Sequence, residues 1–399
     1  MNAKEMIEIV RELAEFKPWE EGWVNLAEVG VELAKREIEY KVDKRTKLID
    51  FIYNYENVLF VKRDNCQRAP IYYVKVRDGA DGFAPQEKTL SKRIKAKDEI
   101  LEWAFWHDLK TVYRELKNKA LPERWYYKKQ NPNFHDPILV NYLTYTFYRL
   151  KKEGKISETE NYAAFNTGLV DKNYEPIYAL FIRNNHGRQP WEFLNFCTRV
   201  ENRGKILTEY FEEPPARAQY YNEISEIIYD VRLKRPTANV EHIISENGDR
   251  LPLEFLKRYT QGIIELKDPA ALDYCAREKY RQDLAKATRN NNVVYRTLMN
   301  RINDAVDLAV KKAEWNFKTA IPMYFPTKNN ISILLPLSLV VDEVVDLALV
   351  VEKTNANNYL GHTVIPLSWA YSNARLITRP DSDWLVAKNI DTDSGDGEN

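Results

Sequence analysis

GWVNLAEVG (residues 22–30), YKVDKRTKLIDFI (40–52) and IYYVKV (71–76) are the stretches that decide how the first part of this chain folds. In the first of them, apolar residues recur at Leu26, Val29 and Leu33, which places them on one face of a helix. Asn25 stands just before this repeat and is of a type that caps the free N–H groups of a first turn. The stretch therefore predicts a short extended segment that runs into a helix.

The second stretch predicts another helix, roughly over 43–55, and two β-like runs follow it at 58–61 and 71–76. Together with an amphipathic helix over 2–16, this order of helices followed by a two-stranded ribbon is that of a winged helix, a relative of the helix-turn-helix. The helix and the ribbon carry cations, which suit contact with phosphates. The predicted RNA-binding residues are Lys41, Lys44, Arg45, Lys47, Arg63 and Arg68.

The sequences of these stretches resemble the LOTUS family, also called OST-HTH, a winged-helix domain that binds RNA. The likeness covers about the first fifth of the chain. It implies that a winged helix here binds structured or G-rich RNA. Because LOTUS-like domains in other settings also dock helicases, it equally allows a protein partner bound through the winged helix.

The amino-acid composition is that of an ordinary globular protein. The chain has 399 residues, and its 59 Lys and Arg equal its 59 Asp and Glu, so a generally polycationic nucleic-acid binder is excluded but a local basic patch is not. The most apolar segment, 331–351, contains three acidic residues, so no membrane span is expected. Three cysteines without metal or framework spacing favour a reducing compartment, and we expect a cytoplasmic protein.

Turn-forming residues and changes in periodicity predict the domain organisation. We expect a winged-helix domain over 1–78, a linker over 79–93, an α+β domain over 94–388 and a disordered acidic tail over 389–399. In the large domain, a mixed or antiparallel sheet would be flanked by helices. No internal repeat is visible.

Within the large domain, periodicity predicts a helix from Ile94 to about Leu116, an antiparallel hairpin over 162–182, a helix near 217–233 and a long helix over about 270–317. Three β-like runs follow at 331–337, 346–351 and 363–367. The segments AFNTGLVDKNYEPIYALFIRN, NVEHIISENGDRLP and AYSNARLITRPDSDWL, among others, resemble the bacterial family catalogued as domain of unknown function 3825. Domains of that family occur beside predicted RNA-binding modules, so the resemblance implies such a neighbour here. It implies no particular reaction, because none is established for the family.

Candidate chemistry in the large domain is sparse. No phosphate-binding loop, dinucleotide fingerprint, zinc-protease motif or nucleophile elbow is present, and the histidines lack metal-ligand spacing, so no metal site is predicted and the cofactor is unknown. His242, beside Glu241, is the candidate acid–base residue, although a surface histidine is the simpler interpretation. Candidate nucleotide or phosphate contacts are Asn166, Thr167, Lys318, Arg375 and Arg379, with a buried ion pair as the alternative for the arginines.

These observations support three hypotheses. The first is an RNA-binding protein in which the winged helix reads RNA and the large domain binds RNA or a nucleotide, with regulation or anti-phage defence as its setting. The second is a hydrolase or transferase that acts on a phosphate group of RNA or a nucleotide, with Asn166, His242, Lys318 and Arg379 in one pocket. The third is a protein-interaction adaptor.

Overall fold

The computed structural model of the chain separates into two units. Unit 1 holds residues 1–95 together with Asp273–Cys275, and unit 2 holds the rest of the chain. The structure describes residues 3–16, 22–38, 48–52, 55, 58–64, 71–77, 96, 98–128, 136–185, 187–326, 328–380, 385–386 and 390. The predicted α+β class is confirmed.

Unit 1 has the element order expected for a winged helix. Its elements are α1 (Ala3–Phe16), β1 (Val24–Asn25), α2 (Leu26–Lys35), α3 (Leu48–Ile52), β2 (Leu59–Asp64) and β3 (Ile71–Val76), and its antiparallel sheet has the order β1-β3-β2. The Asn25 side chain accepts a hydrogen bond from the Ala27 N–H at 2.8 Å and begins α2 as predicted. Leu26, Val29 and Leu33 are buried against α1 and the sheet, as their spacing predicts.

Unit 2 contains two five-stranded sheets, where the sequence predicted one. We call the first sheet and its helices module 1. It consists of α4 (Glu99–Trp103), β4 (Ala104–Phe105), α5 (Leu109–Lys119), α6 (Pro137–Lys152), β5 (Ser157–Glu158), β6 (Tyr162–Val170), β7 (Pro176–Arg183), β8 (Trp191–Cys197) and α7 (Lys205–Glu209). Strands β6 and β7 are the predicted hairpin.

Module 2 is the second sheet with its helices, namely β9 (Thr237–Ala238), α8 (Val240–Asn247), α9 (Leu253–Tyr259), α10 (Tyr274–Asn290), α11 (Asn292–Trp315), β10 (Ile321–Phe325), β11 (Asn330–Leu337), β12 (Leu347–Lys353), β13 (Tyr359–Pro366) and α12 (Leu367–Ile377). Strands β11, β12 and β13 match the three predicted β-like runs. Single 3-10 turns lie at Asn202–Gly204, Ile224–Glu226, Gly248–Arg250, Pro269–Ala271 and Phe317–Thr319.

The two modules repeat one topology. The first sheet has the order β4-β8-β7-β6-β5 and the second has β9-β13-β12-β11-β10, and in each the early short strand pairs in parallel with the last strand. The register repeats as well. A row of Cα partners that runs Ser157, Ala164, Leu180, Asn195 in the first sheet runs Ile321, Leu334, Val350, Thr363 in the second.

The same irregularity follows that row in both sheets. Phe181 pairs with Phe193 so that Leu194 is left as an extra residue, and Val351 pairs with Gly361 so that His362 is left over. In both modules a helix precedes the four-stranded meander, and a helix follows it and covers the other face. Unit 2 is therefore built from two copies of one supersecondary unit, although no repeat is visible in its sequence.

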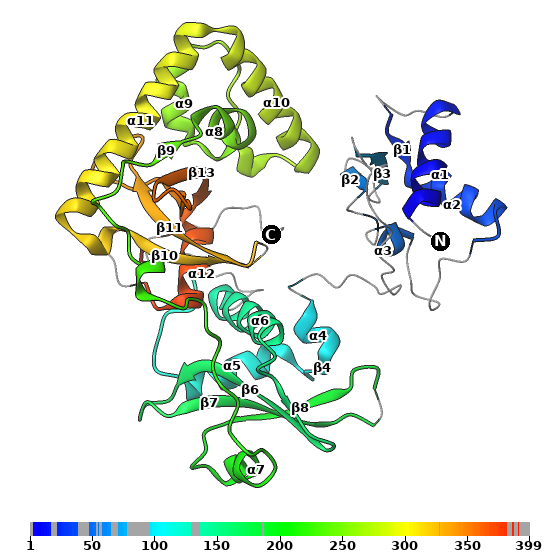
Figure 1. The fold of residues 1–399 in the computed structure, drawn as a ribbon. Helices are drawn as coiled ribbons and strands as arrows, with labels where there is room; N and C mark the ends of the chain where they lie inside the picture. The colour runs from blue at the N-terminus through cyan, green and yellow to red at the C-terminus, as the bar shows by residue number, and fades with distance from the viewer. Residues whose placement is uncertain are drawn as a thin grey trace. The chain divides into compact units, whose positions relative to one another are not determined.

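Helices separate the two sheets (Figure 1). In module 1, α6 covers one face and the short α7 covers the other through Leu207. In module 2, α11 covers one face and α12 covers the other. Because α6 and α12 contribute to the same apolar core, the modules meet at these two helices.

Three predicted helices differ from the structure. The helix predicted from Ile94 to about Leu116 is divided by β4, because His107 adopts a positive φ of 51° and Asp108 starts a new helix by capping it. The helix predicted near 217–233 is an irregular segment with a single 3-10 turn at Ile224–Glu226. The helix predicted over 270–317 is likewise two helices, divided where Asn291 caps α11.

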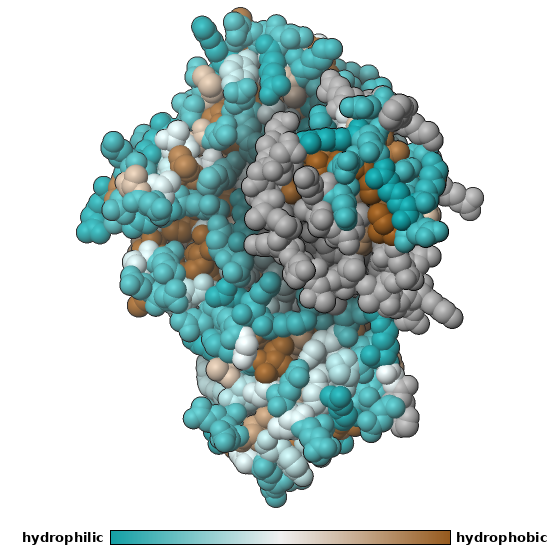
Figure 2. Space-filling model, turned by 45° about the vertical axis from the view of Figure 1, so that its right-hand side comes forward, coloured by the Kyte–Doolittle hydropathy of each residue, from teal (hydrophilic) through white to brown (hydrophobic). Residues whose placement is uncertain are grey.

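Cys197 is a free, buried thiol, and Cys275 is disulfide-bonded, which the cysteine spacing does not indicate. The expectation of a reducing compartment stays a prediction. Among the described helices, none combines the length and the apolar character needed to cross a membrane. Hydrophilic side chains predominate among the coloured residues of Figure 2, and hydrophobic ones gather in separate patches.

Candidate functional site

A polar cleft lies on the α11-side face of the module 2 sheet, at the end where β11 begins and β12 ends. Its volume is about 680 Å³. The strands contribute Ile331, Ile333, Val351, Lys353 and Tyr359. Neighbouring strands align these residues, since Ile333 is the partner of Val351 and Lys353 is the partner of Tyr359.

The opposite wall of the cleft comes from the irregular segment for which periodicity predicts a helix. It contributes Tyr220, Asn222, Ser225 and Glu226. The Tyr220 ring packs on Tyr324 with 4.9 Å between centroids, and its hydroxyl shares a 3.2 Å hydrogen bond with Thr146 of α6. Burial raises the pKa of Tyr220 well above its ordinary value, so this phenol stays neutral.

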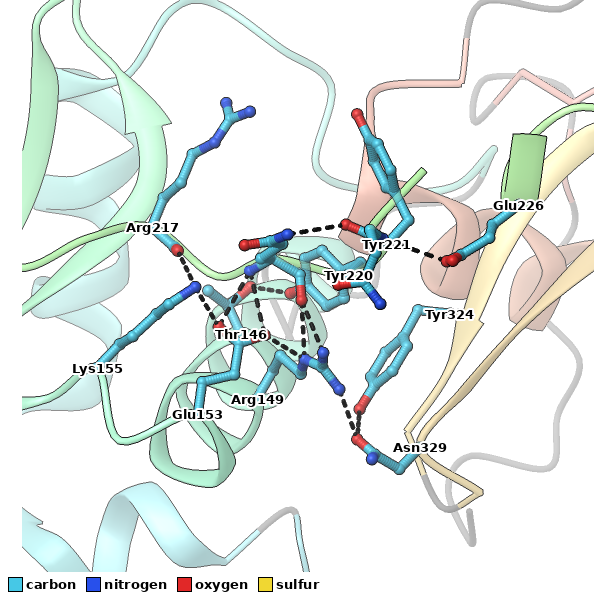
Figure 3. A network of polar contacts seen from close by, with 12 residues as sticks. Thr146, Arg149, Glu153, Lys155, Arg217, Tyr220, Tyr221, Glu226, Tyr324 and Asn329 are labelled. Carbon is cyan, nitrogen blue, oxygen red and sulfur yellow. Dashed lines mark hydrogen bonds and ion pairs between the residues drawn. The ribbon is translucent and has the colours of Figure 1, made fainter. Parts of the chain in front are cut away.

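Arg149 of α6 connects this wall to both modules (Figure 3). Its guanidinium donates to the Gln219 carbonyl at 2.8 Å and to Asn329 Oδ1 at 2.9 Å, and it pairs with Glu153 at 2.5 Å. Burial alone would lower the Arg149 pKa, but the hydrogen bonds and charge interactions with Glu153 and Tyr324 together outweigh burial and raise it. Arg149 is thus a permanent cation whose donors hold the 219–226 segment over the sheet.

Uncharged hydrogen-bonding groups dominate the rest of the lining. They are Asn222, Ser225, Asn329, Asn330, Ser332, Thr354, Asn355 and Asn357. The exposed Lys353 adds a positive charge, and Glu226 accepts a hydrogen bond from the Asn222 N–H at 3.2 Å. A lining of amides and hydroxyls with aromatic neighbours suits recognition of a polar ring compound better than acid–base catalysis.

Comparisons with known proteins bear on unit 2. The family described as Domain of unknown function (DUF3825) matches residues 116–384, more than half of the chain. The chain belongs to this family. No curated protein and no solved structure was found to match it. The DUF3825 match covers the cleft and both sheets except β4, and it leaves residues 1–95 of unit 1 outside.

The candidate phosphate-binding residues of this DUF3825 domain do not share the cleft. Asn166 and Thr167 lie buried in β6, where Asn166 Oδ1 accepts from the Gly168 N–H at 2.9 Å and Thr167 donates to the Ile177 carbonyl at 2.7 Å. Gly168, with φ +75°, permits a close approach by the Tyr142 hydroxyl. A glycine within this strand thus does mark a close approach, but the group that approaches is the Tyr142 side chain and not a ligand.

Arg375 forms the buried ion pair that the sequence allowed as an alternative. Its Nε and one Nη donate to the two oxygens of the Glu123 carboxylate, at 2.7 and 2.8 Å, and its guanidinium lies 4.6 Å from the Tyr142 ring centre. The side chains of Arg375 and Glu123 are 11% and 7% exposed, so the pair joins α12 of module 2 to the chain before α6. The positive charge of Arg375 is therefore paired with a carboxylate of the protein itself.

The other candidates are spread over unit 2. Lys318 is exposed in the 3-10 turn after α11, Arg379 is exposed after α12, and His242 lies at the surface of α8 with Nδ1 3.4 Å from Glu246. None of them lines the cleft, so the residue set of the phosphate-transfer hypothesis is not assembled there. Among the described residues, no cluster of three or more His, Cys, Asp or Glu side chains could hold a metal ion.

The predicted RNA-binding residues of unit 1 lie mostly outside the described residues: Lys41, Lys44, Arg45, Lys47 and Arg68. Arg63 lies in β2, and its side chain is likewise undescribed. The described part of unit 1 does contain a cationic and aromatic surface, which sequence reasoning missed because its residues alternate with core residues along two strands.

We call this surface the β2–β3 face. Phe60 is 41% exposed and lies opposite Lys75 in the strand ladder. The Arg77 guanidinium stacks over the Phe60 ring at 4.1 Å and donates to the Leu59 carbonyl at 3.2 Å. Lys62, on the same face, lies 5.9 Å from the Trp23 ring. Leu59 and Val74 point the other way into the core.

Proposed function

We propose that this protein binds single-stranded RNA through the β2–β3 face of unit 1. The observation that carries the proposal is the pair of Phe60 and Arg77. The partly exposed ring offers a flat surface on which a base can stack, and the guanidinium over it adds a positive charge. Stacking of this kind tolerates any base sequence because every base has a π-face.

Charge on the same face supports the proposal. Neither Lys75 nor Arg77 forms an ion pair with a described carboxylate, and both stand on the side of the ladder that carries Phe60. A chain with zero formal net charge needs such a local concentration of cations to attract phosphates. The resemblance of this region to LOTUS domains, and the predicted cations at 41–47, support the same partner.

Binding is measured by fluorescence anisotropy of a labelled RNA of about twelve nucleotides, within the range of single-strand site sizes. We expect Phe60→Ala to weaken binding by about 5- to 100-fold, which corresponds to the loss of one stacked base. The double variant Lys75→Glu with Arg77→Glu should weaken binding further and reduce the salt slope by roughly 0.7 for each phosphate that the protein no longer neutralises.

The matched control places the same charge change on unit 2, with Lys110→Glu and Lys172→Glu at exposed positions. It should bind RNA like the unmodified protein. Equal affinities for all variants, with folding verified by circular dichroism, would contradict RNA binding at this face. A loss confined to Lys44→Glu, Arg45→Glu and Lys47→Glu would place the RNA on the predicted helix instead.

A further inference from the structure

The duplicated topology identifies what occupies, in module 1, the region that corresponds to the cleft of module 2. Strand partners set the correspondence: Arg183 and Trp191 are a pair in module 1, and Lys353 and Tyr359 are the equivalent pair in module 2. By the same register, Phe181 of module 1 corresponds to Val351 of module 2. Val351, Lys353 and Tyr359 all line the cleft.

In module 1 this region is closed by an indole ring. Trp103, the last residue of α4, lies with its ring centre 4.8 Å from that of Phe181 and 6.2 Å from that of Trp191. Its N–H donates to the Glu158 carboxylate at 2.8 Å. A flat heteroaromatic ring with one hydrogen-bonded edge therefore lies over the strand residues of module 1.

Module 2 fills only part of the equivalent region. The Tyr229 ring packs on Tyr359 with 4.6 Å between centroids, and the smaller Val351 stands where module 1 has Phe181. The space that borders Val351, Ile331 and Ile333 is the cleft of about 680 Å³, which is within the roughly 300–1,000 Å³ typical of small-molecule sites.

We propose that the cleft of module 2 binds a nucleobase, in the region equivalent to the one that the Trp103 indole fills in module 1. This rests on the proposed function, because it takes the base from RNA or from a nucleotide. The surrounding amides and hydroxyls supply donors and acceptors for the edge of the base. Lys353, exposed at the cleft, supplies the charge for an attached phosphate.

Isothermal titration of the full-length protein with AMP, GMP, CMP and UMP tests the proposal. At least one of these should bind. Lys353→Glu, which reverses the charge beside the phosphate, and Ser225→Trp, which fills the cleft from its exposed wall, should each weaken binding by about tenfold or more, the loss expected for one stacked or charge-assisted interaction. Arg183→Glu makes the same charge change at the equivalent position of module 1 and should leave affinity within about twofold.

A short RNA containing 4-thiouridine, crosslinked by light and mapped by mass spectrometry, distinguishes the two sources of the base. Crosslinks within 220–226 or 351–359 without mononucleotide binding would assign the cleft to an RNA base. Mononucleotide binding that Lys353→Glu and Ser225→Trp leave unchanged would overturn the proposal. So would the absence of both mononucleotide binding and crosslinks in these segments.

The β2–β3 face is tested separately. Phe60→Ala should reduce the RNA anisotropy signal and leave mononucleotide titrations unchanged, because Phe60 belongs to unit 1. If mononucleotides bind the cleft while all variants of the β2–β3 face bind RNA normally, the proposed function fails and the base-binding cleft stands.

Discussion

Modules 1 and 2 share strand order, register and bulge, yet they differ in how their equivalent faces are filled. Module 1 packs five large rings together, namely Trp103, Phe147, Phe165, Phe181 and Trp191. Module 2 has aliphatic residues at the positions of Phe165 and Phe181, which are Leu335 and Val351. The same backbone arrangement therefore accommodates an aromatic core in module 1 and, in module 2, an aliphatic core with a polar cleft at its strand ends.

Replacing Trp103 is the most direct test of this difference between the two modules. Trp103→Ala should lower the free energy of unfolding by about 4 kcal/mol, because it removes a buried indole and leaves a cavity that its aromatic neighbours cannot fill. Urea denaturation measures the change. Leu101→Ala, on the same helix but 39% exposed, is the control and should cost well under half as much. Equal losses for both variants would argue against Trp103 as the closing residue of module 1.

The junction of the modules should show the next largest effect. Glu123→Ala leaves the buried Arg375 guanidinium without its carboxylate and should cost roughly 3 kcal/mol in urea denaturation. The double change Glu123→Leu with Arg375→Met removes both charges and should recover part of that loss, since an apolar pair of similar size avoids the unpaired charge. A double variant less stable than Glu123→Ala would contradict this account.

Gly168 marks a local difference between the sheets, because β11, the counterpart of β6, contains no glycine. Gly168→Ala should cost about 2 kcal/mol, since φ is +75° and an added Cβ would lie 2.5 Å from the Tyr142 hydroxyl. Gly154→Ala shares the positive φ but meets no atom within 4 Å, so about 1 kcal/mol is expected. Both variants strain the backbone, but only Gly168→Ala also creates a steric overlap with Tyr142, so thermal unfolding of the two variants distinguishes these costs. Identical losses of stability would exclude a role for Tyr142.

The smallest effect concerns Cys197, whose equivalent in module 2 is Ile365. Burial raises the pKa of the Cys197 thiol to about 11, so the neutral thiol prevails near pH 7.5 and the nucleophilic thiolate is scarce. Iodoacetamide should leave Cys197 unmodified in the native protein and label it fully in urea, as read by peptide mass spectrometry. Native labelling at the rate of the urea-unfolded chain would show that this face of the first sheet is open.

Local patterns predicted many elements of the fold. The β6–β7 hairpin and β11 to β13 follow from runs of β-forming residues, and α2 follows from its apolar spacing and the Asn25 cap. The site was much less predictable. Arg375 and Asn166 have the chemistry of ligand-binding groups, but their partners, Glu123 and the Gly168 backbone, are identified only by the folded structure.

By itself the sequence determined the α+β class, several strands, the family of unit 2 and the absence of a strong catalytic motif, because these depend on neighbouring residues along the chain. The tertiary structure decided the duplication and the cleft. Strand register pairs residues that are distant in sequence, and the two modules keep the same register while their side chains differ. An irregular segment that local periodicity assigned to a helix became a wall of the cleft, because Arg149 holds its backbone from another helix.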